Sequence, residues 1–185
     1  ISLFGNNCGL IAISGTGSNA GIISKGYIEK RVISLGYLLG DEGSGADIGF
    51  RFIKMLLSGK LSEKISKDFC QKNNYSFSGL IEKLYQSSRP QTFAASLIPL
   101  IEPYREEADI INILTGSFQS MIGVMILPLL QERCSVPIGF CGSVAATFEE
   151  ELRSLFSRND MQIRCIKPEA VEGLARYYSA YADKG

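Results

Sequence analysis

The sequence contains no histidine and no tryptophan among its 185 residues. Without histidine, the chain has no Ser-His or Cys-His nucleophile pair, no histidine general base and no histidine metal ligand of its own. The charges also cancel, since 19 Lys and Arg stand against 19 Asp and Glu. Proteins that bind nucleic acid or anionic membranes typically carry a basic surplus, so we expect neither of these partners.

The sequence lacks a C-x-x-C pair, and its cysteines are odd in number; the five are Cys8, Cys70, Cys134, Cys141 and Cys165. This odd number and spacing argue against a disulfide framework, a zinc ribbon and a thioredoxin-like site. Reduced and mostly buried thiols in a cytoplasmic protein fit better.

The apolar run from Ile110 to Leu130 carries no charge, but its polar residues and Pro128 favour a buried helix over a membrane span.

Apolar residues make up 45% of the chain, which is the ordinary globular fraction and suits one domain with a real core. Short apolar or alternating runs predict strands at 10–14, 20–24, 27–33, 136–141 and 161–166. Periodic segments predict helices from 44 to about 57 and at 62–72, 77–87, 92–104, 108–133, 144–156 and 169–181, with a disturbance at Pro128. Strands followed by helices predict an α/β domain.

A glycine-rich turn, Gly15-Thr16-Gly17-Ser18, separates the first two predicted strands. Glycine lets main-chain N–H groups approach an anion closely, and the Thr and Ser hydroxyls add donors to the same concavity. Phosphate oxygens of a nucleotide suit such a turn, although a hairpin that uses glycine for geometry alone fits it too. The pattern is neither a P-loop nor the G-x-G-x-x-G of a dinucleotide fold.

Two further glycine motifs precede predicted helices. In the segment 40–45 (GDEGSG), two acids stand between glycines, where an exposed carboxylate suits sugar hydroxyls or a magnesium-bound water. Helix capping by Asp41, Glu42 and Ser44 is the alternative interpretation. The turn Gly142-Ser143 follows a predicted strand, and the free N–H groups of the next helix suit an adenosine or a phosphate, although any α/β crossover has this form.

In this order along the chain, the three motifs resemble the second half of the BadF/BadG/BcrA/BcrD ATPase family, and within it the N-acetylglucosamine-kinase-like proteins. These belong to the larger group of sugar kinases, actin and Hsp70 chaperones. The resemblance rests on residues 13–19 (ISGTGSN), 35–45 (LGYLLGDEGSG) and 142–145 (GSVA), with further support from Glu172-Gly173-Leu174. It implies a ribonuclease-H-like α/β domain with a small mixed sheet flanked by helices.

The same resemblance implies a reaction and a set of site residues. The reaction is the ATP-dependent phosphorylation of an amino sugar, with N-acetylglucosamine expected and with ATP and Mg²⁺ as cofactors. The residues implied to bind ATP are Gly15, Thr16, Gly17, Ser18, Ala95, Gly142 and Ser143. The residues implied to bind the sugar are Asn19, Ser34, Leu35 and Asp41, of which Asp41 corresponds to the acid that binds sugar hydroxyls.

The chain departs from the family pattern in two ways. The family's sugar kinases have Gly-Gly-Trp-Gly before the acidic loop, whereas this chain has Ile33-Ser34-Leu35-Gly36, so Leu35 replaces the tryptophan that contacts the amino sugar. Nothing here resembles the family's first phosphate loop or its aspartate general base, which lie in its N-terminal domain. We therefore expect residues 1–185 to be a C-terminal ATPase/sugar-kinase-like domain, with the general base and the N-terminal domain outside this chain.

Two other functions stay open. An activating ATPase of a radical dehydratase, in which a dimer shares an iron–sulfur cluster, needs exposed cysteines near the glycine turns. A degenerate sugar- or nucleotide-sensing module, or a dimerisation domain, fits the replacement at Leu35, although the intact Asp41-Glu42 pair argues against it. The expected partners are the sugar, ATP and the N-terminal domain of the same protein, with a homodimer left open.

Overall fold

The computed structural model describes residues 3–5, 7–131, 136–171, 175 and 179. One five-stranded sheet has the order β3-β2-β1-β4-β5. Its strands are β1 (Gly9–Ser14), β2 (Ser18–Ser24), β3 (Tyr27–Arg31), β4 (Ile138–Cys141) and β5 (Ile163–Lys167). The first three strands pair antiparallel, while β4 lies parallel to β1 and β5 lies parallel to β4. The predicted α/β domain with a small mixed sheet is confirmed.

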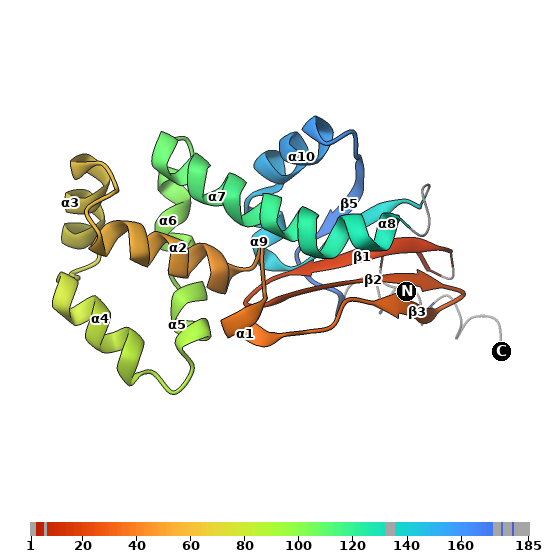
Figure 1. Ribbon diagram of the computed structural model, residues 1–185, viewed down its shortest axis with the longest axis horizontal. Coiled ribbons are helices and arrows are strands. Elements are labelled where there is room, and N and C mark those ends of the chain that lie inside the picture. The colour runs from red at the N-terminus through yellow and green to blue at the C-terminus, as the bar shows by residue number, and fades with distance from the viewer. Residues whose placement is uncertain (1–2, 6, 132–135, 172–174, 176–178, 180–185) are drawn as a thin grey trace.

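Helices make up most of the rest of the described chain. Between β3 and β4 lie α1 (Gly36–Leu39), α2 (Gly45–Leu57), α3 (Glu63–Lys72), α4 (Phe77–Gln86), α5 (Pro90–Ala95), α6 (Ile98–Ile101), the 3-10 turn η1 (Glu102–Tyr104), α7 (Ala108–Met121), the π-helical segment η2 (Ile122–Ile126) and α8 (Leu127–Leu130). Between β4 and β5 lie α9 (Ser143–Thr147) and α10 (Glu149–Arg158). Figure 1 shows α7 and α8 running along the sheet, and α3 and α4 at the opposite end of the molecule.

The helix α2 follows from its sequence directly. Ser44 caps it, because the Ser44 hydroxyl accepts a hydrogen bond from the N–H of Asp47 at 3.2 Å. On one face of the helix, Ile48, Phe52 and Leu56 are fully buried. The helix therefore begins at a defined residue and packs one face against the core. This packing also fixes the position of the loop that precedes the helix.

Several predicted boundaries are wrong for identifiable reasons. The predicted helix at 92–104 is three short pieces, α5, α6 and η1, because Pro99 and Pro103 lack the N–H that a continuous helix needs. The predicted helix at 144–156 is broken at Phe148. The side chain of Phe148 is buried, and its backbone has φ −110° and ψ 38°, which is not helical. The short α1 is absent from the prediction. The predicted helix at 169–181, Cys134 and residues 172–174 lie wholly or mostly outside the described residues.

The long apolar run is disturbed as predicted, but upstream of the proline. The N–H of Leu127 donates to the carbonyl of Ile122, five residues back. This π-helical turn lies directly before Pro128, which has no N–H to donate to the preceding turn. By length and composition, Ala108–Leu130 is long and apolar enough to cross a membrane, yet half of its apolar window is buried inside the fold. In the structure, α7 packs on α2 and α10, and η2 packs on β2.

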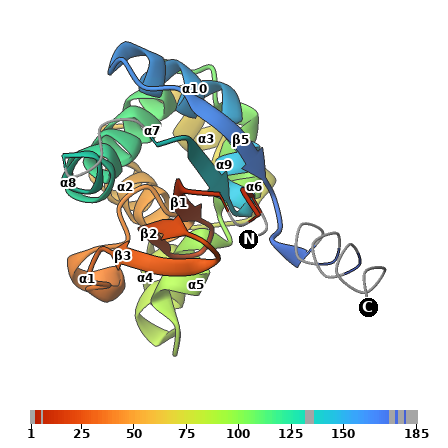
Figure 2. The same cartoon turned by 90° about the vertical axis from the view of Figure 1, so that its right-hand side faces the viewer.

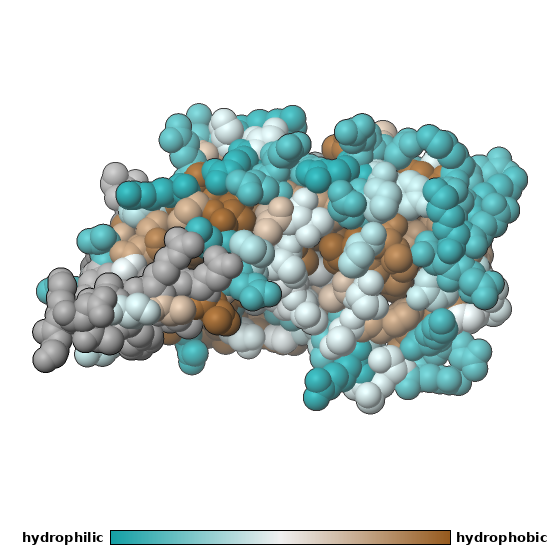
Figure 3. All heavy atoms as spheres, turned by 180° about the vertical axis from the view of Figure 1, so that it is seen from behind, coloured by the Kyte–Doolittle hydropathy of each residue, from teal (hydrophilic) through white to brown (hydrophobic). Residues whose placement is uncertain are grey.

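The core lies between the helices and one face of the sheet. Along β1, Leu10 and Ala12 are fully buried, whereas Ile13, which follows Ala12 and lies on the opposite face of the strand, is half exposed. On the outer strand β3, Tyr27 and Ile28 are largely exposed. Figure 2 shows the sheet from its end, with α7 and α10 on one side of β1 and β2. Viewed from behind, the surface is hydrophilic at its rim with apolar patches between, as Figure 3 shows.

Candidate functional site

The glycine hairpin and the acidic loop are bonded to each other. The hydroxyl of Ser14, at the end of β1, donates to the carbonyl of Gly43 at 2.6 Å. The hydroxyl of Ser18, at the start of β2, donates to the carbonyl of Glu42 at 2.8 Å. Both serines are buried, so these bonds are shielded from water. The two motifs therefore form one structural unit, although 20 or more positions separate them in the sequence.

Asp41 bends towards the hairpin within this unit. It is one of four non-glycine residues at positive φ in the described chain, with φ 62°, which is a conformation that costs energy for a residue with a Cβ. Its Oδ1 accepts a hydrogen bond from the N–H of Ser18 at 3.3 Å. A Cβ on Gly17 would lie 2.9 Å from Oδ2 of Asp41, so a side chain there would displace the carboxylate.

The hairpin also occupies the N-terminus of α2. The N–H of Gly45 donates to the carbonyl of Gly15 at 2.7 Å, and the N–H of Ala46 donates to the carbonyl of Thr16 at 3.1 Å. These contacts occupy N–H groups at the helix N-terminus that would otherwise be available to bind an anion. The N–H groups of Thr16 and Gly17, by contrast, have no acceptor in the part of the chain that the structure describes. The donors available to an anion are thus on the hairpin itself.

The remaining residues predicted to bind ATP lie against the same hairpin. Gly142 has φ 130°, and a Cβ there would lie 2.2 Å from the carbonyl oxygen of Ser14. A Cβ on Gly45 would lie 3.1 Å from Cβ of Ala95 and 3.2 Å from Val144. Ser143, next to Gly142, is exposed. Segments from three distant parts of the sequence thus meet at one point, where small residues keep the backbones close.

The residues predicted to bind the sugar line one cavity of about 230 Å³ beside the hairpin. Its walls are Ser18, Asn19, Val32, Ile33, Ser34, Leu35, Leu39, Gly40, Asp41, Glu42, Val124 and Met125. Typical ligand clefts run from roughly 300 to 1,000 Å³, so this cavity suits a small ligand or one wall of a larger cleft. Its lining combines polar groups of the hairpin and the acidic loop with an apolar wall that includes Leu35, Leu39 and Val124.

Sequence reasoning missed part of this cavity. Val124 and Met125 come from η2, far along the chain, and no feature of their own marks them as site residues. Pro128 was the available signal, because a proline in a helix displaces the backbone of the preceding turn. Leu39 belongs to α1, which was also missed. Glu42 was recognised only as part of the glycine-bracketed acidic pair.

Cys141 and Cys165 are poorly suited to hold a cluster. Burial raises the pKa of the Cys141 thiol, with a contribution from the charge of Glu169, and burial likewise raises the pKa of the Cys165 thiol. Metals bind the thiolate, which such environments disfavour. In the described part of the chain, no group of three or more His, Cys, Asp or Glu side chains is arranged to hold a metal ion.

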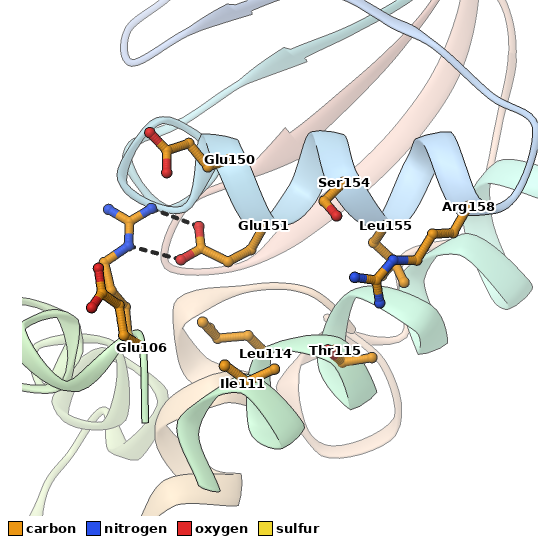
Figure 4. Close-up of a pocket in the computed structure, with 10 residues that line it drawn as sticks. Glu106, Ile111, Leu114, Thr115, Glu150, Glu151, Ser154, Leu155 and Arg158 are labelled. Carbon is orange, nitrogen blue, oxygen red and sulfur yellow. Dashed lines mark hydrogen bonds and ion pairs between the residues drawn. The ribbon is translucent and has the colours of Figure 1, made fainter. Parts of the chain in front are cut away.

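A larger groove, of about 350 Å³, lies between α7 and α10 and shares no lining residue with the hairpin cavity. Figure 4 shows Leu114 and Thr115 on one wall and Glu151 and Leu155 on the other. Arg105 binds Glu151 through two hydrogen bonds of 2.7 Å each, and this contact raises the pKa of Arg105. In this groove, the charges of Arg105 and Glu151 are therefore paired with each other. The sequence predicts no site residue in this groove.

Two solved structures share this fold. A Porphyromonas gingivalis protein named as a candidate N-acetylglucosamine kinase has a TM-score of 0.90 and 32% identity, with 96% of this chain and 62% of that chain covered. A candidate N-acetylglucosamine kinase from Chromobacterium violaceum has a TM-score of 0.70 and 19% identity, with 95% and 62% covered, which is a likeness of fold alone. This chain thus spans 62% of the length of each.

Both likenesses confirm the ribonuclease-H-like, sugar-kinase type of fold, and the first also shows a structural relationship to a candidate N-acetylglucosamine kinase. Searches with models of protein families and against curated proteins found no match. Membership of the BadF/BadG/BcrA/BcrD family therefore stays a prediction.

Proposed function

We propose that residues 1–185 are the C-terminal, nucleotide-binding part of an ATP-dependent amino-sugar kinase, with N-acetylglucosamine as its sugar and the cytoplasm as its location. One observation carries the proposal. Asn19, Ser34, Leu35 and Asp41 line a single cavity together with Ser18 of the hairpin, and the neighbouring N–H groups of Thr16 and Gly17 have no acceptor among the residues that the structure describes. Donors for phosphate and acceptors for hydroxyls are thus side by side, as transfer between ATP and a sugar requires.

On the nucleotide side, the N–H groups of Thr16 and Gly17 and the exposed Thr16 hydroxyl donate to phosphate oxygens. The turn at Gly142 and Ser143, packed on the end of β1, receives the adenosine. Mg²⁺, when bound, neutralises the phosphate charge. Because no cluster of three ligating side chains occurs among the described residues, the donor set fits a metal held by phosphates, water and at most one or two carboxylates.

On the sugar side, Asp41 accepts hydrogen bonds from sugar hydroxyls. Its Oδ1 is oriented by the N–H of Ser18, which leaves the other carboxylate oxygen and the remaining lone pairs for the ligand. Leu35 and Val124 form part of the apolar wall, against which the C–H face of a sugar ring packs. The general base that activates the sugar hydroxyl is supplied by the N-terminal domain of the same protein.

The proposal is tested by titrating this chain with Mg-ATP and with N-acetylglucosamine in a calorimeter. We expect both to bind, and we expect Asp41→Asn to weaken sugar binding by about tenfold or more, since a charge-assisted acceptor is lost. Asp160→Asn is the matched control, because Asp160 is also an aspartate at positive φ, 56°, and lies outside the cavity. Equal losses in the two variants, or no binding of either ligand, would refute the proposal.

The dehydratase-activator alternative finds no support in the cysteine environments described above. A sensing module that binds without catalysis is separated from a kinase by a coupled assay on the complete protein. Turnover of ATP that depends on the amino sugar supports the kinase, and binding without turnover supports the sensor.

A further inference from the structure

Asp47, on the first turn of α2, joins three parts of the fold with one carboxylate. Its Oδ2 accepts hydrogen bonds from the Ser117 hydroxyl at 2.6 Å and from the Gly43 N–H at 3.2 Å. Its Oδ1 accepts a hydrogen bond from Nε of Arg51 at 2.7 Å. Ser117 lies on α7 and is fully buried. The carboxylate therefore ties α2 and α7 to the acidic loop.

The bond to Gly43 completes a set that holds two consecutive peptide groups. The Glu42–Gly43 peptide is held at its oxygen by Ser18 and at its N–H by Asp47. The next peptide is held at its oxygen by Ser14. Since Asp41 directly precedes these peptides and has an unfavourable φ, the anchored backbone determines where its carboxylate lies.

A helix cap alone does not account for this arrangement. An aspartate in the first turn is stabilised by the helix dipole whatever its side-chain partners are. In the observed geometry, the buried Ser117 on another helix donates to the same Oδ2 atom that receives the Gly43 N–H. This second donor fixes the carboxylate in the orientation that reaches the loop.

We infer that Asp47, oriented by Ser117, is a positioning residue that holds the acidic loop so that Asp41 meets the sugar. The inference rests on the proposed function for its ligand. Neither Asp47 nor Ser117 lines the cavity, so neither touches the sugar. Their effect reaches the ligand through the Gly43 peptide and Asp41.

Three variants and one control test the inference in the complete protein. Asp47→Ala removes the bond to Gly43, and we expect the KM for the sugar to rise about tenfold with a much smaller change in the KM for ATP. Ser117→Ala removes one donor to Oδ2 but leaves the carboxylate bonded to Arg51 and to the Gly43 N–H, so the rise should be smaller. Asp47→Asn keeps an acceptor for Gly43 and Ser117 and should restore most of the sugar affinity.

Glu149→Ala is the matched control. Glu149 and Arg153 form an i,i+4 ion pair with the same 2.7 Å distance between Nε and a carboxylate oxygen as the pair formed by Asp47 and Arg51, but on α10. If Asp47 acted only through its ion pair, Asp47→Asn would be as damaging as Asp47→Ala. The control should change neither KM.

A second readout does not need activity. In Asp47→Ala, the N–H of Gly43 should exchange with deuterium at least tenfold faster than in the unmodified protein, while the buried core of β1 keeps its protection. If no sugar binds but this exchange accelerates, the proposed function fails and the anchoring of the loop stands. Unchanged exchange at Gly43, or an equal loss of affinity for sugar and ATP, would overturn the inference.

Discussion

At the residue scale, Gly43 is the most constrained position in the acidic loop. It has φ 75°, and a Cβ there would lie 2.9 Å from Cβ of Met121 as well as 2.3 Å from its more mobile methyl carbon. The residue therefore meets two separate demands, a left-handed backbone and contact with α7. Asp41 meets the first demand without being glycine, which fits a residue kept for its carboxylate rather than for its backbone.

Gly43→Ala should therefore destabilise the fold by about 2–4 kcal/mol, the sum of left-handed strain and overpacking. Gly59→Ala is the control, because Gly59 also has a positive φ, 66°, but nothing within 4 Å of its Cβ position. The control should cost only about 1 kcal/mol. The measurement is the urea midpoint at unchanged slope. Equal losses would show that Met121 does not crowd the loop.

The thiols give a pH prediction at the same scale. Burial raises the pKa of Cys70, Cys141 and Cys165. A higher pKa means less thiolate at a given pH, so alkylation of these thiols in the folded protein should be slower than that of a free cysteine at pH 8. The rate should climb only at more alkaline pH. Peptide mapping after iodoacetamide treatment, with the urea-unfolded chain as reference, checks this.

Fast alkylation of Cys141 at neutral pH would contradict the assigned environment. It would also support testing the alternative function, an activating ATPase whose dimer shares an iron–sulfur cluster.

At the element scale, the close contact between α2 and α5 places Ala95 beside the hairpin. A Cβ on Gly49 would lie 2.1 Å from the carbonyl oxygen of Ala94, so the two backbones touch there. The sequence contains Gly49 in an otherwise ordinary helical pattern. Nothing in that pattern says which helix the glycine faces, because the partner lies more than forty positions away.

Gly49→Ala should push α5 away from α2. We expect a loss of about 1–3 kcal/mol in stability and a larger loss of ATP affinity than of sugar affinity, because Ala95 moves and Asp41 does not. Gly123→Ala is the control, since Gly123 is also helical but open, with nothing within 4 Å of its Cβ position. It should be neutral or slightly stabilising. Thermal unfolding and calorimetry measure the two effects. A sugar-selective loss in Gly49→Ala would contradict this role of α5.

How far the sequence predicts each element depends on how local its cause is. The helix α2 and strands β1, β4 and β5 carry their own cap, periodicity or apolar run, and each of their ends lies within two residues of the predicted position. The break at Phe148 and the π-helical turn before Pro128 depend on tertiary packing and on where a lost bond is absorbed. Local patterns do not contain that information.

The candidate site divides in the same way. The glycine hairpin and the acidic loop are recognisable in the sequence, because closely spaced glycines beside hydroxyl or acidic residues are typical of loops that bind a ligand or cap a helix. Their partnership through Ser14 and Ser18 is not visible, since a buried serine looks like any other serine. The apolar wall with Val124 is equally hidden. Its assignment needs the fold of the whole chain.

At the scale of the whole molecule, the parallel and antiparallel strands bring three glycine motifs to one end of β1. The register places Ser14 opposite Ser18, and Ile13 opposite Cys141 on β4, so the hairpin and the turn at Gly142 are neighbours by topology. The chain covers 62% of the length of each of the two solved structures compared above. Under the proposed function it binds both ligands and turns over neither without its N-terminal domain.

The most direct test of this account is an amide ¹H–¹⁵N NMR titration of the chain with Mg-ATP and then with N-acetylglucosamine. We expect ATP to shift the signals of Thr16, Gly17 and Gly142. We expect the sugar to shift those of Asn19, Ser34 and Asp41, so that the two sets adjoin along the hairpin. Shifts that instead cluster around Arg105 and Glu151 in the groove between α7 and α10, or that separate onto opposite faces, would contradict the account.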